Sequence, residues 1–188
     1  EGGKHGAAKY LTELVKEGII KDVSLFPERF KDEKLIAQGD KSIMLAMVPP
    51  QEVQIIVFTP SWSQAREIGI KLIKKYQALL KQNGIDITFG AESGCTTKQL
   101  FTKDGRLITL ELVLDILDKA SDSLGEDAKF VRYALDIASS EMYLPEIDMY
   151  YIGPDTARNE SGLVSNEEFT KYKLALFKRY PRFISCED

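Results

Sequence analysis

Residues 130–136 read Phe130-Val131-Arg132-Tyr133-Ala134-Leu135-Asp136, a largely apolar run that ends in a carboxylate. A second run of this kind, Arg182-Phe183-Ile184-Ser185-Cys186-Glu187-Asp188, carries Glu187 near its end. Both runs are typical of strands, and they lie one or two strand-plus-helix units apart. In parallel β/α packing the ends of such strands meet at one rim, where ligands and metals bind. We therefore expect Asp136 and Glu187 to lie close together at a binding site.

The composition is that of an ordinary globular protein. The 188 residues are 44% hydrophobic and 29% charged, which is enough to form one sizeable core. A net charge of −4 argues against charge-driven binding to nucleic acid or to an anionic membrane. Cys95 and Cys186 lie 91 positions apart and have no metal-binding or redox spacing. Because there is no run of about 18 apolar residues and no signal-peptide pattern, we expect a cytoplasmic protein.

Strands and helices alternate along the chain, which predicts an α/β architecture. Besides the two strands above, strands are expected at residues 42–48, 52–59 and 85–89, and a loop at residues 90–97. Amphipathic helices are expected at residues 63–82 and 109–123, each with a glycine just beyond its end. A hairpin is expected at residues 148–152, and a capping box from Ser165 to Glu168 opens a last helix.

The residues before the expected strand at 42–48 are predicted to form a loop, a short helix and an irregular segment. A glycine-rich loop at residues 1–6 leads into a short expected helix at residues 7–18. Residues 19–41 are charged and irregular, which is typical of an excursion over the surface.

Several segments carry a resemblance to one family. Residues 134–143 resemble the enolase segment around a magnesium-binding aspartate, and residues 178–188 resemble the family's "KRYP…SIED", which holds the next metal ligand. Weaker matches are residues 90–94 with "GDEGG", residues 1–9 with "NGGSHAGNK" and residues 60–69 with the first barrel helix. The chain is identified as a divergent member of the enolase family. The resemblance implies the fold of a partial enolase-type (β/α)8 barrel, with residues 12–47 as an insertion that is atypical of the family.

The resemblance also implies roles for individual residues. Enolases interconvert 2-phosphoglycerate and phosphoenolpyruvate with Mg²⁺, and by resemblance Asp136 and Glu187 are two of three carboxylates on one magnesium. Glu92 matches the glutamate that helps hydroxide leave as water, and His5 matches a histidine on a loop over the substrate. The partner glutamate lies in the family's "QEFMI" strand. One alignment gives Glu52 as its counterpart, and a second puts Ile55 there.

Each of these residues also has an ordinary interpretation. Strand-end acids such as Asp136 and Glu187 often cap helices or face water. A lone acid in a loop, such as Glu92, usually faces water. His5 lies in a segment whose composition is typical of a flexible loop. By resemblance, the catalytic lysine and the third metal ligand are expected beyond Asp188.

Two functions stay open. The first is a magnesium-dependent glycolytic lyase acting on a small phosphorylated acid, which the family implies is a homodimer. The second is a weak or inactive enolase paralogue that serves as a structural subunit of a larger assembly, for example in the ciliary cytoskeleton.

Overall fold

The computed structural model describes residues 52–89, 95–97, 102–106, 108–145, 147–152 and 163–187. These residues divide between two compact units. The sheet unit comprises Pro50–Ile137 with Leu176–Glu187, and the hairpin unit contains Ala138–Ala175. The predicted strand at 42–48, the predicted helix at 7–18 and the predicted insertion at 12–47 lie outside the described residues.

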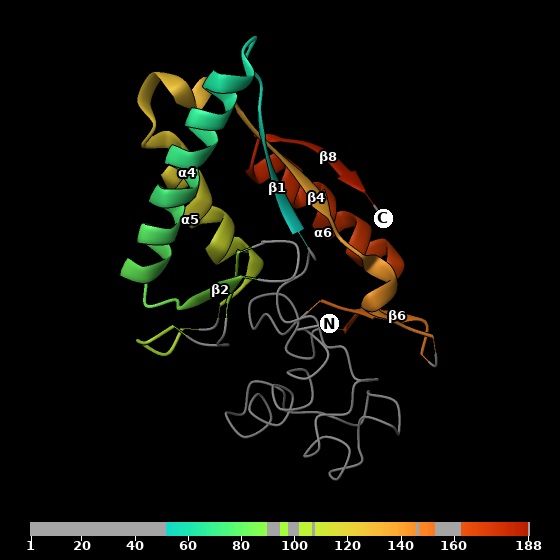
Figure 1. The fold of residues 1–188 in the computed structure, drawn as a ribbon. Coiled ribbons are helices and arrows are strands. Elements are labelled where there is room, and N and C mark those ends of the chain that lie inside the picture. Colours follow the sequence, from blue (N-terminus) through green and yellow to red (C-terminus); the bar gives the residue numbers. More distant parts are fainter. Residues whose placement is uncertain are drawn as a thin grey trace. The chain divides into compact units, whose positions relative to one another are not determined.

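The sheet unit is built on three strands in the order β1-β4-β8 (Figure 1). Strand β1 is Glu52–Val57, β4 is Val131–Asp136 and β8 is Phe183–Glu187. β4 and β8 are parallel, as the sequence predicted for the two strands that end in acids. β1 runs antiparallel to β4, so the start of β1 lies beside the end of β4.

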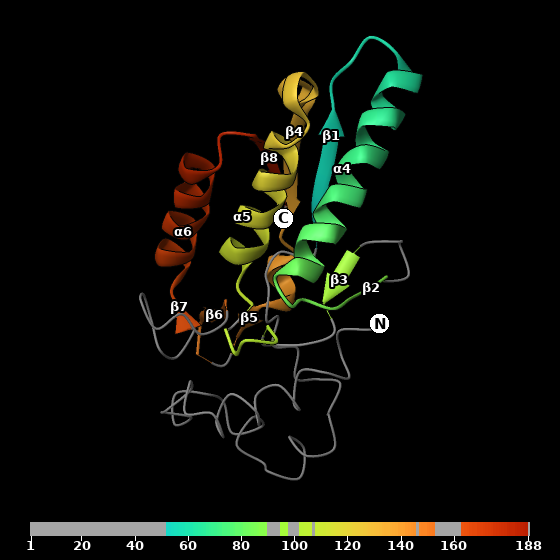
Figure 2. The same cartoon turned by 90° about the vertical axis from the view of Figure 1, so that its left-hand side faces the viewer.

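Two long helices pack together beside this sheet, as Figure 1 and Figure 2 both show. α4 spans Trp62–Gln82 and buries Ile68, Leu72 and Leu80, while α5 spans Leu110–Asp122 and buries Leu110, Leu114 and Leu117 among others. The Ser61 side chain accepts a hydrogen bond from the backbone N–H of Gln64, and the Thr109 side chain caps α5 in the same way. The predicted helices at 63–82 and 109–123 are therefore confirmed to within a residue.

A tight turn ends α4. Gly84 has a φ of +70°, and its carbonyl accepts a hydrogen bond from the Lys103 backbone N–H over 3.1 Å. A Cβ at Gly84 would lie only 2.9 Å from that same nitrogen, so only glycine fits both the backbone conformation and the close approach.

A short hairpin follows the turn. β2, Ile87–Phe89, pairs antiparallel with β3, Cys95–Thr97. The prediction that residues 95–97 form part of a loop is wrong, because these three residues gain a strand partner that no local pattern reveals. A 3-10 helix, Gly125–Phe130, links α5 to β4.

The hairpin unit has its own small antiparallel sheet. Its strands are β5, Tyr143–Leu144, β6, Met149–Tyr151, and β7, Leu163–Val164, in that order, and β5 follows a 3-10 turn at Ser139–Glu141. The strand pair β5-β6 confirms the predicted hairpin arm. The rings of Tyr150 and Phe169 lie 4.9 Å apart and join this sheet to the following helix.

The last helix, α6, spans Asn166–Arg179 and begins at the predicted capping box. A Glu168 carboxylate oxygen accepts from the Ser165 backbone N–H over 2.8 Å, and the Glu168 N–H donates to the Ser165 hydroxyl over 3.3 Å. These contacts with Ser165 lower the pKa of Glu168. Within the described residues, no helix has both the length and the apolar character needed to cross a membrane.

Candidate active site

Three acidic residues lie in one row across the ends of three strands. In the antiparallel pair Glu52 is the partner of Asp136, and in the parallel pair Asp136 is the partner of Glu187. Neighbouring strands lie about 4.8 Å apart, so the row brings three carboxylate-bearing residues to one edge of the sheet. The expected meeting of Asp136 and Glu187 is present in the register of the strands.

The acids share one face of the sheet, since side chains alternate along a strand and direct partners lie on the same side. Tyr133 and Leu135 belong to the opposite face and are buried. Ile55 is the partner of Tyr133, so it too belongs to that buried face. Of the two alternatives from the sequence, Glu52 is therefore the residue beside Asp136, and Ile55 is not.

Backbone pairing fixes Glu187 at the end of β8. The Ile137 N–H donates to the Glu187 carbonyl over 3.2 Å, and the Tyr133 N–H donates to the Arg182 carbonyl over 2.9 Å. Between these two points the register shifts: Tyr133 pairs with Phe183, but Ala134 pairs with Ser185, which leaves Ile184 as an extra residue in a bulge. The bulge therefore determines which later side chain of β8 faces Asp136.

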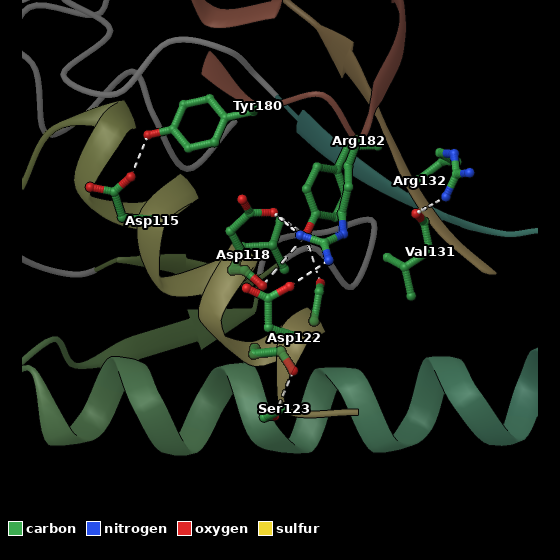
Figure 3. Close-up of polar contacts among 12 residues, drawn as sticks. Asp115, Asp118, Asp122, Ser123, Val131, Arg132, Tyr180 and Arg182 are labelled. Carbon is green, nitrogen blue, oxygen red and sulfur yellow. Dashed lines mark hydrogen bonds and ion pairs between the residues drawn. The ribbon is translucent and has the colours of Figure 1, made fainter. Parts of the chain in front are cut away.

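A cluster of side chains attaches the start of β8 to α5 (Figure 3). The Arg182 guanidinium binds Asp118 over 2.6 Å and Asp122 over 2.5 Å. The Tyr180 hydroxyl donates to Asp115 over 2.6 Å. Asp115, Asp118 and Asp122 follow the helical spacing of three and four, so they form one acidic stripe on α5.

The electrostatics of this cluster follow from burial and pairing. Burial opposes the charge on Arg182, but hydrogen bonds to Asp122 and Asp118 outweigh it and raise the pKa of the guanidinium. Burial also raises the pKa of Tyr133, against a hydrogen bond with Ser121 that lowers it. Both residues therefore keep their usual protonation state near neutral pH, which suits a structural cluster better than proton transfer.

The acid row fits magnesium in the type of its donors. Mg²⁺ prefers carboxylate and water oxygens, and proteins commonly bind it through one or two carboxylates. Asp136 and Glu187 offer two on adjacent strands. Among the residues that the structure describes, however, no three His, Cys, Asp or Glu side chains converge closely enough to hold a metal ion. The row therefore supplies suitable oxygen ligands without forming a three-ligand site.

Comparison with known proteins identifies the family of the chain. A family model described as "Enolase, C-terminal TIM barrel domain" matches residues 41–188. The chain belongs to the enolase family. Its strands and helices are therefore a portion of the enolase-type barrel, as the resemblance implied.

Curated relatives agree with this assignment. The enolase of Ureaplasma parvum serovar 3 is 29% identical over 197 aligned residues, which cover 100% of this chain and 42% of that protein. The enolase of Corynebacterium kroppenstedtii is 29% identical over 141 residues, covering 73% of this chain and 30% of that protein. The chain thus spans less than half the length of these enolases.

Two of the enolase-type candidate residues, Glu92 and His5, lie outside the described residues. Sequence reasoning missed Gln54 and Arg182. Gln54 follows Glu52 by two positions in a strand and so shares its face, and this spacing could have identified it. Arg182 gave no local signal, because its partners Asp118 and Asp122 are 64 and 60 positions away.

Proposed function

We propose that this chain is part of a working enolase, which interconverts 2-phosphoglycerate and phosphoenolpyruvate in a magnesium-dependent reaction of cytoplasmic glycolysis. The proposal rests on one observation above the others: Glu52, Asp136 and Glu187 share one register row at one edge of the sheet. Membership of the enolase family supplies the chemistry for which such a row is suited.

Asp136 and Glu187 are the proposed magnesium ligands, with further ligands from elsewhere in the polypeptide. Bound magnesium would stabilise the extra negative charge that develops on the substrate carboxylate when a carbon-bound proton is removed. The two acids can serve because they lie on adjacent strands and share a face, so both carboxylates can approach one ion.

The remaining roles belong to Glu92, Glu52 and His5. Glu92 would donate the proton with which hydroxide leaves as water, and Glu52 would act as its partner beside the metal ligands. His5 would contact the bound substrate. The strand register supports the assignment of Glu52 over Ile55, since only Glu52 lies in the row with Asp136.

The test is conversion of 2-phosphoglycerate by the full-length protein, followed through the ultraviolet absorbance of phosphoenolpyruvate, with and without Mg²⁺. We expect magnesium-dependent activity that falls about a hundredfold or more in Glu92→Gln, as is typical when an essential acid is removed. Asp136→Asn and Glu187→Gln should raise the magnesium concentration needed for activity. Glu126→Gln is the matched control, because the Glu126 side chain is 97% exposed and lies away from the row.

The opposite outcome has a clear meaning. A folded protein with no activity above that of Glu92→Gln would contradict the lyase proposal. It would favour the alternative of a structural subunit in a larger assembly. Analytical ultracentrifugation of the same sample would separate the homodimer expected of an enolase from such an assembly.

A further inference from the structure

Gln54 lies on the same face of the sheet as the three acids. It is the register partner of Ala134, which in turn pairs with Ser185, so these three form the row next to the acids. From this row the Gln54 side-chain amide Nε2 donates a hydrogen bond of 3.3 Å to Glu187 Oε1. Gln54 on β1 therefore contacts a proposed metal ligand on β8, although these two strands are not neighbours in the sheet.

The contact crosses the whole width of β4. Two strand spacings separate β1 from β8, which is roughly 10 Å, so both side chains must extend over the central strand. The central residue is Ala134, whose methyl group leaves room for them. A larger side chain at this position would stand between the two groups.

The chemistry of the donor suits a carboxylate that must also bind a cation. An amide N–H can hold one carboxylate oxygen in place and leave the other oxygen with its lone pairs available. Lys or Arg could give a similar hydrogen bond, but each would add a positive charge that repels Mg²⁺. Hydrogen bonds of this kind orient ligating carboxylates in metal sites.

We propose that Gln54 is a positioning residue, which orients Glu187 for magnesium. This inference rests on the proposed function, since it takes Glu187 to be a metal ligand. Gln54 contributes little to the fold itself, because β1 is already held by a six-residue ladder with β4 and the Gln54 side chain is exposed. The role should therefore appear in metal affinity and not in thermal stability.

The test is Mg²⁺ affinity of the full-length protein, measured by titration calorimetry, together with the melting temperature in EDTA. Gln54→Met keeps the length of the side chain but removes the donor. We expect Mg²⁺ binding to become about tenfold weaker at an unchanged melting temperature. This is the lower end of the range that is typical when a hydrogen-bond partner of a metal ligand is removed. Gln54→Asn keeps the amide but is one methylene too short, and it should show the same loss.

Gln82→Met is the matched control, since Gln82 is an exposed glutamine at the end of α4, and it should leave the affinity unchanged. Unaltered Mg²⁺ affinity in Gln54→Met, with Asp136→Asn still impaired, would overturn the positioning role and leave the metal site standing. A parallel fall in affinity and melting temperature would show a structural role and also overturn it. If the unaltered protein binds no Mg²⁺, the metal site itself fails and this inference fails with it.

Discussion

Arg182 shows how much one residue outside the acid row contributes to it. Its guanidinium holds two aspartates of α5, while its backbone carbonyl accepts from Tyr133 on β4. The same residue thus fixes the start of β8 against both a helix and the central strand. The segment "KRYP" was recognised in the sequence only as a mark of the family, but Tyr180 in this segment also contacts α5.

Arg182→Gln should destabilise the protein by about 2 kcal/mol, because two hydrogen bonds to charged groups are lost. The half-buried Asp118 carboxylate also loses the positive charge that pairs with it. The side chains of Arg182 and Asp118 are only 21% and 26% exposed. Urea unfolding of the full-length protein measures the change.

Arg106→Gln is a suitable comparison, since its ion pair with Asp104 has both side chains at least half exposed. Its cost should be much smaller than that of Arg182→Gln, because water screens an exposed ion pair. Equal costs for the two substitutions would contradict the special role of Arg182.

Among the elements, local pattern predicted those with a strong period or a clear cap. Helices α4 and α5 and the capping box of α6 were found because apolar spacing and end signals agree. Strand β3 could not be predicted, because three residues are too few to show the alternation of apolar and polar side chains that is typical of a strand. The direction of β1 could not be read from its own residues, because a strand pattern is the same in either direction, and so the place of Glu52 beside Asp136 required the structure.

Gly84 gives a sharp test at the end of α4. Gly84→Ala should cost about 1–3 kcal/mol in unfolding free energy for the left-handed backbone, and more for the contact with Lys103. Gly105→Ala should cost only the backbone part, since its φ is +84° and a Cβ there meets nothing within 4 Å.

Gly69→Ala completes the series and should stabilise the protein by about 1 kcal/mol, because Gly69 lies inside α4 with open space around it. Chemical denaturation of all three variants gives the order. If Gly105→Ala lowers the unfolding free energy as much as Gly84→Ala does, the close approach of Gly84 to Lys103 does not contribute to the cost of the substitution.

For the molecule as a whole, the family and the partial barrel could be predicted from collinear motifs, and the family model confirms them. The complete site could not be predicted. The pairing of Asp136 with Glu187 could be predicted because parallel strands place their ends together. The hydrogen bond from Gln54 to Glu187 could not, because it joins strands that are not neighbours in the sheet.

Magnesium should stabilise the whole protein if it binds at the acid row. At a concentration of a hundred times its dissociation constant, a ligand specific for the folded state adds about 2.7 kcal/mol to the unfolding free energy. Thermal unfolding with and without Mg²⁺ measures this. Asp136→Asn should lose most of the gain, and the same gain in that variant would mean that magnesium binds elsewhere.

The bulge at Ile184 means that β8 contains one residue more than its pairing requires. With Ile184 deleted, Phe183 could still pair with Tyr133 and Ser185 with Ala134 in regular alternation, so Glu187 would still face Asp136. We expect this deletion to retain Mg²⁺ binding in calorimetry, while one residue inserted after Ser185 puts the Cys186 thiol beside Asp136 and abolishes it. Loss of a residue at the bulge would thus leave Glu187 opposite Asp136, whereas gain of a residue just after Ser185 would move Glu187 out of this pairing.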